Sequence, residues 1–137
     1  MFARCGVYAG PPPSGPATSR LTVTNESRGI TIARCVNQAF TSESRRKGLL
    51  GQESLPPGGG LWIVPCEGVH TVGMRFAIDL IYLDRQRRIR KLVQNLRPWR
   101  ISLCLSAYSV LELPAGALIT SKCQVGEILS FRPYSGE

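Results

Sequence analysis

The feature that most restricts the fold of this chain is an apolar run, FAIDLIYL, at residues 76–83, in which Asp79 is the single charged residue. Branched and aromatic side chains occupy positions of both parities, which is typical of a strand covered on both faces. We therefore expect a central strand here, with a layer of structure on each side. Residues 84–86 (DRQ) are expected to turn, and residues 87–93 to form the returning strand of a hairpin. The charges of that second strand mark an exposed face.

Shorter segments predict further strands. Residues 21–36 alternate apolar and polar side chains, with Leu21 and Val23 on one parity and then Ile30 and Ile32 on one parity. This pattern indicates two short strands, or one strand preceded by an irregular segment. Residues 56–60 (PPGGG) can sustain neither helix nor strand, so we expect a loop there. Strands are also expected at 61–64, ending at Pro65, and at 110–113 and 127–131.

Two short helices complete the expected elements. Thr41 or Ser42 can cap a helix that carries Glu43 at its start and three cations toward its end. This helix is expected to end near Gly48 or Gly51. A turn or short helix is expected at 117–122. Since strands outnumber helices and no βαβ alternation is present, we predict a mostly β (α+β) fold: a compact, closed or folded-over mixed or antiparallel sheet with one or two short helices.

The length of 137 residues fits a single domain. Residues 1–19 include AGPPPSGPATS, which has almost no core-forming side chains, and we expect a disordered leader there. The domain is expected at 20–132, with a short tail at 133–137. Residues 1–10 lack the continuous apolar stretch of a secretory signal. No apolar run approaches the roughly 20 residues that span a bilayer, so no membrane span is expected.

The cysteines indicate a reducing compartment. Five are present: Cys5, Cys35, Cys66, Cys104 and Cys123. Their number is odd and no pair has C-x-x-C spacing, which predicts reduced thiols in a cytoplasmic protein, four of them buried. No metal site and no cofactor are predicted, because the sequence lacks the corresponding ligand spacings and motifs.

Four segments carry a family resemblance. They are SRRKGLLG at 44–51, GLWIVPC at 60–66, HTVGMRFAID at 70–79 and VLELPAG at 110–116. In order and spacing they resemble the family called domain of unknown function 192, in particular its members with an H-T-x-x-M-R-F-x-I-D segment, over roughly residues 30–131. Val72 stands where an aromatic residue is usual, Ala77 where proline is common, and Glu127 where aspartate is usual. The resemblance implies a small β-rich domain with no established biochemical activity.

Asp79 interrupts the central strand, where an ionised carboxylate needs a partner. An ion pair with Arg45, Arg46 or Arg75 would fix the first helix to the sheet, and this structural role is the preferred interpretation. The alternative is a catalytic or ligand-binding role.

Glu112 raises the same question in the strand at 110–113. Alternation places it on the opposite face from Leu111 and Leu113. Either it is exposed to solvent, or it meets Asp79 or an arginine in a polar pocket. Two carboxylates that approach closely would raise one pKa and create an acid/base pair.

His70 is the only histidine and the natural general base near neutral pH. Cys66 lies four residues earlier, so a Cys–His nucleophile pair and a metal site are two further hypotheses for this segment. A third ligand or orienting group at a recognisable spacing is missing, which disfavours both. The preferred interpretation is that His70 and Thr71 order the loop before the central strand by hydrogen bonds. Met74 and Phe76 are expected to line the core or a pocket.

The net charge of +8 favours contact with anionic partners. The basic hairpin at 85–100 is a candidate nucleic-acid surface, because cations bind phosphates and an aromatic ring can stack on a base. Its candidate residues are Arg85, Arg87, Arg88, Arg90, Lys91 and Trp99. Solvated charge is ordinary at a hairpin turn, however, and no nucleic-acid-binding motif is present.

The sequence therefore favours a non-catalytic binding module for a small anionic ligand or a protein partner. The candidate ligand-binding residues are Arg45, His70, Arg75, Asp79 and Glu112. One alternative is a small enzyme with His70, Asp79 and Glu112 as acid and base groups, which requires that the three converge in one concave site. The other is nucleic-acid binding through the hairpin, which would be salt-dependent.

Overall fold

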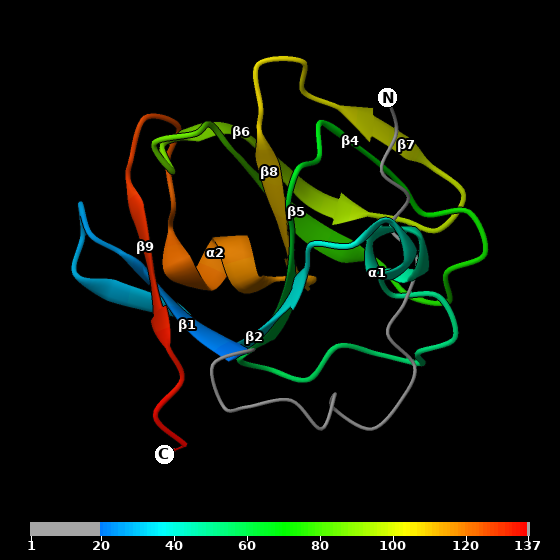
Figure 1. Ribbon diagram of the computed structural model, residues 1–137, viewed down its shortest axis with the longest axis horizontal. Helices are drawn as coiled ribbons and strands as arrows, with labels where there is room; N and C mark the ends of the chain where they lie inside the picture. Colours follow the sequence, from blue (N-terminus) through cyan, green and yellow to red (C-terminus); the bar gives the residue numbers. More distant parts are fainter. Residues whose placement is uncertain (1–19, 137) are drawn as a thin grey trace.

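The computed structural model describes residues 20–136, so the predicted leader at 1–19 lies outside the described residues. The strands are β1 (Arg20–Asn25), β2 (Ile30–Ala39), β3 (Gly59–Ile63), β4 (Gly68–His70), β5 (Ile78–Leu83), β6 (Ile89–Leu96), β7 (Ile101–Leu103), β8 (Ser109–Pro114) and β9 (Leu129–Pro133). The helices are α1 (Ser42–Lys47) and α2 (Ala117–Ser121). The predicted mostly β fold with short helices is confirmed (Figure 1).

Seven strands form one curled sheet in the order β6-β5-β8-β3-β2-β1-β9, and β4 pairs with β7 in a separate two-stranded sheet. β2 and β3 pair in parallel, while the other pairs are antiparallel, so the sheet is mixed. The sheet's first and last strands meet at one end through a bridge between Arg88 and Ile128. Flanking hydrogen bonds run from Ile89 N–H to the Glu127 carbonyl and from Leu129 N–H to the Arg87 carbonyl. The result is a half-barrel.

Both faces of the central strands are buried, as the apolar run predicts. Ile81 and Leu83 of β5 belong to a cluster inside the curve of the sheet, which also includes Leu118 of α2. Ile78 and Leu80 belong to a second cluster on the outer face. That outer cluster includes Leu49, which follows α1, Val69 of β4 and Met74 from the loop before β5. All six residues of β5 are buried, which confirms the predicted double layer.

Helix α1 begins and ends where its capping residues predict. The Thr41 side chain accepts a hydrogen bond from Ser44 N–H, and the Ser44 side chain in turn accepts one from Thr41 N–H, which forms a capping box. Gly48 ends the helix at φ 41°, a conformation that favours glycine.

Several sequence expectations are corrected. Strands β4 and β7 were not predicted, and the strand after the PPGGG loop begins at Gly59 rather than at residue 61. In β2 the buried residues are Ala33, Val36 and Ala39, while Ile30 is 40% exposed. Register irregularities between β1 and β2 shift the inward-facing parity, which a strict alternation does not foresee.

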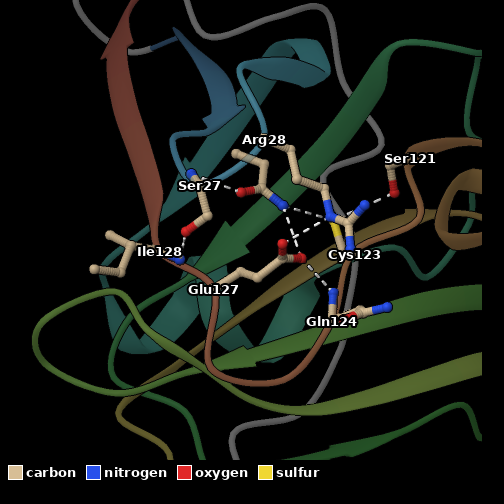
Figure 2. Close-up of polar contacts among 8 residues, drawn as sticks. Ser27, Arg28, Ser121, Cys123, Gln124, Glu127 and Ile128 are labelled. Carbon is tan, nitrogen blue, oxygen red and sulfur yellow. Dashed lines mark hydrogen bonds and ion pairs between the residues drawn. The ribbon is translucent and has the colours of Figure 1, made fainter.

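A polar network fastens the β1–β2 turn to the segment between α2 and β9 (Figure 2). The Glu127 carboxylate accepts hydrogen bonds from Gln124 N–H at 2.6 Å, from the Asn25 amide at 3.2 Å and from the Arg28 guanidinium at 2.7 Å. Burial by itself would raise the pKa of Glu127, but these hydrogen bonds and the Arg28 charge outweigh it and lower the pKa. The glutamate at residue 127 is thus fully engaged in holding these two segments together.

The four cysteines in the described part of the chain are free thiols, as predicted. Cys66 and Cys123 are buried, but Cys35 and Cys104 are only half-buried, and Cys5 lies outside the described residues. Neither helix between residues 20 and 136 has the length and apolar character needed to cross a membrane.

Replacing Gly60 by alanine tests the packing of β3 against β8. A Cβ at residue 60 would lie 2.9 Å from the Glu112 carbonyl oxygen and 3.2 Å from Cδ2 of Leu113. Backbone cannot yield as a flexible side chain can, so we expect Gly60→Ala to lower the free energy of unfolding by about 1–3 kcal/mol. Urea denaturation measures this, with exposed Ser54→Ala as the control. Equal midpoints for the two variants would contradict the prediction.

Candidate functional site

Asp79 is buried in β5 and is held by backbone amides. Its Oδ1 accepts a hydrogen bond from Asn95 N–H at 2.8 Å, and its Oδ2 accepts from Gly116 N–H at 3.1 Å and Leu118 N–H at 2.9 Å. Asn95 has φ 52° near the end of β6, and the other two donors lie at the start of α2. The expected arginine partner is therefore wrong: within residues 20–136 backbone donors satisfy the carboxylate. Asp79 ties β6 and α2 to β5.

Glu112 is fully buried in β8, so the expectation that it is exposed is wrong. It lies between Leu61 of β3 and Leu80 of β5, which both belong to the outer apolar cluster. Neither carboxyl oxygen has a hydrogen-bond partner within residues 20–136. Desolvation by burial raises the pKa of Glu112 from its ordinary 4.5 to about 8. The side chain is therefore mainly protonated at neutral pH.

The groups that an acid/base mechanism needs do not share a face. Leu80 lies directly opposite Glu112, and Asp79 is the residue before Leu80. Side chains alternate along a strand, so Asp79 projects to the inner face, toward Leu118, and Glu112 to the outer face. His70 belongs to the separate β4–β7 sheet. The sheet itself thus separates the two carboxylates.

Cys66 and His70 are engaged in local contacts. The Cys66 thiol donates to the Gly68 carbonyl at 3.1 Å, and burial raises the pKa of Cys66 to about 11, whereas a nucleophilic thiol needs a lowered pKa. His70 Nδ1 accepts a hydrogen bond from Val72 N–H at 3.3 Å. Thr71 is buried and its hydroxyl donates to the Arg97 carbonyl at 2.6 Å. These contacts agree with a loop-ordering role for this segment.

The two arginines of the predicted pocket lie apart. Arg45 projects from α1 and donates to the Phe40 carbonyl at 2.8 Å. Arg75 is exposed and lies 3.9 Å from the exposed Glu53 carboxylate. Within residues 20–136, neither Arg45 nor Arg75 forms a hydrogen bond or ion pair with Asp79 or Glu112.

The candidate nucleic-acid residues are spread along the hairpin, and its cations contact the chain itself. Arg85 lies over the Tyr108 ring, 4.2 Å from its centroid, and Arg87 lies over Trp62 and Phe131 at 5.4 and 5.3 Å. Three others donate hydrogen bonds: Arg88 to the Gly126 carbonyl, Arg90 to Ser106 Oγ and Lys91 to the Leu103 carbonyl. Trp99 follows the far end of β6, about 25 Å along the strand from the turn. Trp99 and the cations of the turn, Arg85, Arg87 and Arg88, therefore lie at opposite ends of β6.

The structure shows instead a cleft of about 490 Å³ between the end of α1, the PPGGG loop and the two ends of the described chain. Its polar lining residues are Arg20, Arg34, Cys35, Asn37, Gln52 and Tyr134. A hydrogen bond from Tyr134 N–H to the Arg20 carbonyl brings β9's end to β1 at the cleft wall. Asn37 Oδ1 is buried there without a hydrogen-bond partner in the described part of the chain.

Charge distinguishes this cleft from a second one of about 650 Å³. The second cleft is lined by Arg45 and Arg85 but also by Glu67 and Asp84, so its formal charges cancel. The first cleft carries two arginines and, among its described lining residues, no acid. Sequence reasoning missed its residues because Arg20 comes from β1, Asn37 from β2 and Tyr134 from the segment after β9. The only local signal was the glycine-rich loop, whose Gly58 and Gly59 leave the cleft wall bare of side chains.

Replacing Asp79 by asparagine tests its structural role. The amide offers one acceptor oxygen, and its NH₂ group would face a backbone N–H donor, leaving buried amides unsatisfied. We expect Asp79→Asn to lower the free energy of unfolding by about 2–4 kcal/mol, measured by urea denaturation. Glu53→Gln, whose side chain is 88% exposed, is the control. A loss no larger than that of the control would contradict the role.

Replacing Glu112 by glutamine tests its buried, protonated state. Between pH 4.5 and about 8 the folded chain holds a proton on Glu112 that the unfolded chain has lost. The free energy of unfolding therefore falls as pH rises through this window, by up to about 1.4 kcal/mol per pH unit, and the effect levels off above it. Glu112→Gln removes this contribution, so its stability relative to wild type should rise with pH. Parallel stability curves for the variant and wild type between these pH values would contradict the prediction.

Comparisons with known proteins place the chain in a family. Residues 22–131 match the model of the family described as Uncharacterized ACR, DUF192. No curated protein matches the sequence. A Sinorhizobium meliloti 1021 protein proposed as a transcription regulator is similar in structure, with TM-score 0.72 and 22% identity over 82% of this chain and 92% of that one. A protein of unknown function from Novosphingobium aromaticivorans DSM 12444 has TM-score 0.72 and 20% identity over 89% and 94%.

Such low identities establish the shared fold alone. The family model, in contrast, covers most of the sequence and confirms the resemblance carried by its four segments. The chain therefore belongs to the domain of unknown function 192 family.

Proposed function

We propose that the protein is a binding module for a small anionic ligand, which it holds in the cleft lined by Arg20 and Arg34. The observation that carries this proposal is the charge of the cleft: two guanidinium groups and no carboxylate among its described lining residues. Arginine binds carboxylate and phosphate groups through paired N–H donors. A concave site with convergent polar groups is the usual form of a small-molecule site.

Asn37 supplies the second support. Its buried Oδ1 lacks a partner within residues 20–136, and a buried acceptor without a donor lowers stability. A ligand that carries a hydroxyl or amino donor beside its anionic group would satisfy this atom. The candidate class is thus a small hydroxylated or amino-bearing anion.

The proposal differs from the sequence hypothesis in its residues. The role of a small-anion module is retained, but Arg20 and Arg34 replace Arg45 and Arg75 as the cations. The enzyme alternative receives no support from the arrangement of His70, Asp79 and Glu112 described above.

Titration of the labelled protein with inorganic phosphate and with citrate, followed by backbone amide NMR shifts, tests the proposal. We expect saturable shifts at residues 34–37 and 58–61. Arg34→Ala and Arg20→Ala should each weaken binding by about tenfold, as expected for a lost charge-assisted hydrogen bond. Arg97→Ala removes the same charge from an exposed position outside the cleft and should leave binding unchanged. Equal weakening by Arg97→Ala, or shifts confined to other segments, would overturn the proposal.

A further inference from the structure

Exposed apolar side chains gather on β7 and on the segments that flank β4 and β7. Trp99 is 66% exposed, Ile101 64% and Leu105 77%, and Leu103 and Val72 are also exposed. Ile101 and Leu103 lie on the outward face of β7, while Ser102 between them points inward and bonds Tyr82. Figure 1 shows β4 and β7 together on the side of the molecule opposite β1 and β9. We call the residues Val72, Trp99, Ile101, Leu103 and Leu105 the apolar stripe.

Positive charge is concentrated in the same part of the chain. Residues 85–108 contain seven cations and no acid, while the whole chain has 17 cations and 9 acids. The seven are Arg85, Arg87, Arg88, Arg90, Lys91, Arg97 and Arg100. Two of them lie beside the apolar stripe, because Lys91 Nζ donates to the Leu103 carbonyl at 2.7 Å and Arg90 to Ser106 Oγ at 3.4 Å. Arg97 and Arg100 flank Trp99 and are exposed.

We infer that the apolar stripe docks on an anionic lipid surface, with Trp99 and Leu105 inserted at the headgroup boundary and the cations on the lipid headgroups. Charge complementarity favours this partner, because cations close to an anionic bilayer are attracted to its headgroups. Tryptophan is typical of the membrane interface, where its ring is apolar and its N–H stays hydrated.

The composition of the apolar stripe argues against nucleic acid as the main partner. Bases stack on aromatic rings, and the apolar stripe has a single ring among four aliphatic side chains. Aliphatic side chains gain free energy by leaving water for an apolar phase, which a bilayer offers and a phosphate backbone does not. Of the hairpin cations that would bind phosphates, Arg85, Arg87 and Arg88 lie at the opposite end of β6 from Trp99.

Co-sedimentation of the full chain with vesicles tests the inference. We expect it to pellet with phosphatidylcholine vesicles that contain about one quarter phosphatidylserine, more than with pure phosphatidylcholine, and less as salt rises from about 0.1 to about 0.5 M. Leu105→Ser should weaken partitioning by about tenfold, and the double variant Arg97→Glu/Arg100→Glu by at least as much. Ile119→Ser alters an equally exposed residue, 68% exposed, on α2 and should have no effect.

Tryptophan emission supplies a readout that does not depend on a disruptive variant. Trp62 is buried, so a blue shift on adding anionic vesicles should come from Trp99 and should vanish in Trp99→Phe, which keeps an apolar ring. Thermal midpoints within a few degrees of wild type show that each variant is folded.

Four results would overturn the inference. They are equal pelleting with neutral and anionic vesicles, equal loss in Leu105→Ser and Ile119→Ser, binding of a short oligonucleotide without vesicle binding, and a dimer in solution that Leu105→Ser dissociates.

Discussion

The fold depends on a carboxylate that the chain buries and then surrounds with its own backbone. The Asp79 carboxylate accepts hydrogen bonds from the backbone N–H groups of Asn95, Gly116 and Leu118. One side chain therefore fixes the end of β6 and the start of α2 on β5. A buried carboxylate without such donors would be costly. With these three donors Asp79 connects β5 to β6 and to α2, and an apolar side chain could not make these hydrogen bonds. The inner apolar cluster, the position of α2 and the end of the hairpin all follow from it.

The central sheet also explains why its two buried carboxylates behave differently. Asp79 faces the inner side, where α2 begins and offers free N–H groups, whereas Glu112 faces the outer side, where it meets Leu61 and Leu80. The backbone donors satisfy the carboxylate oxygens of buried Asp79. Glu112 is buried without such donors among the described residues, and its burial raises its pKa to about 8. Chemistry that requires both cannot occur across the sheet. The two proposed binding surfaces, the arginine-lined cleft and the apolar stripe, use neither of these carboxylates.

Patterns within one segment predicted the fold well. The run at 76–83 indicated a doubly covered strand because its apolar residues occupy both parities, and Thr41 and Gly48 marked the limits of α1. β4 and β7 have three residues each, too few for a pattern, and exist only because the segments pair across about 30 residues. The sequence showed that Asp79 needs partners but not that distant backbone amides supply them. The cleft could not be predicted from the sequence because its walls come from distant segments, among them β1, β2 and the segment after β9.

The pairing of β1 with β9 also orders the events of synthesis. Thr24 lies opposite Ser130 in this pair, and the bridge from Arg88 to Ile128 joins the same last strand to β6. The residues of β9, up to Pro133, must therefore be synthesised before this strand can cover the edge of β1. Until then the edge of β1 stays open to pairing with another chain. Contacts so distant in sequence slow folding. The nascent chain is therefore exposed to aggregation through the edge of β1 until β9 has been synthesised.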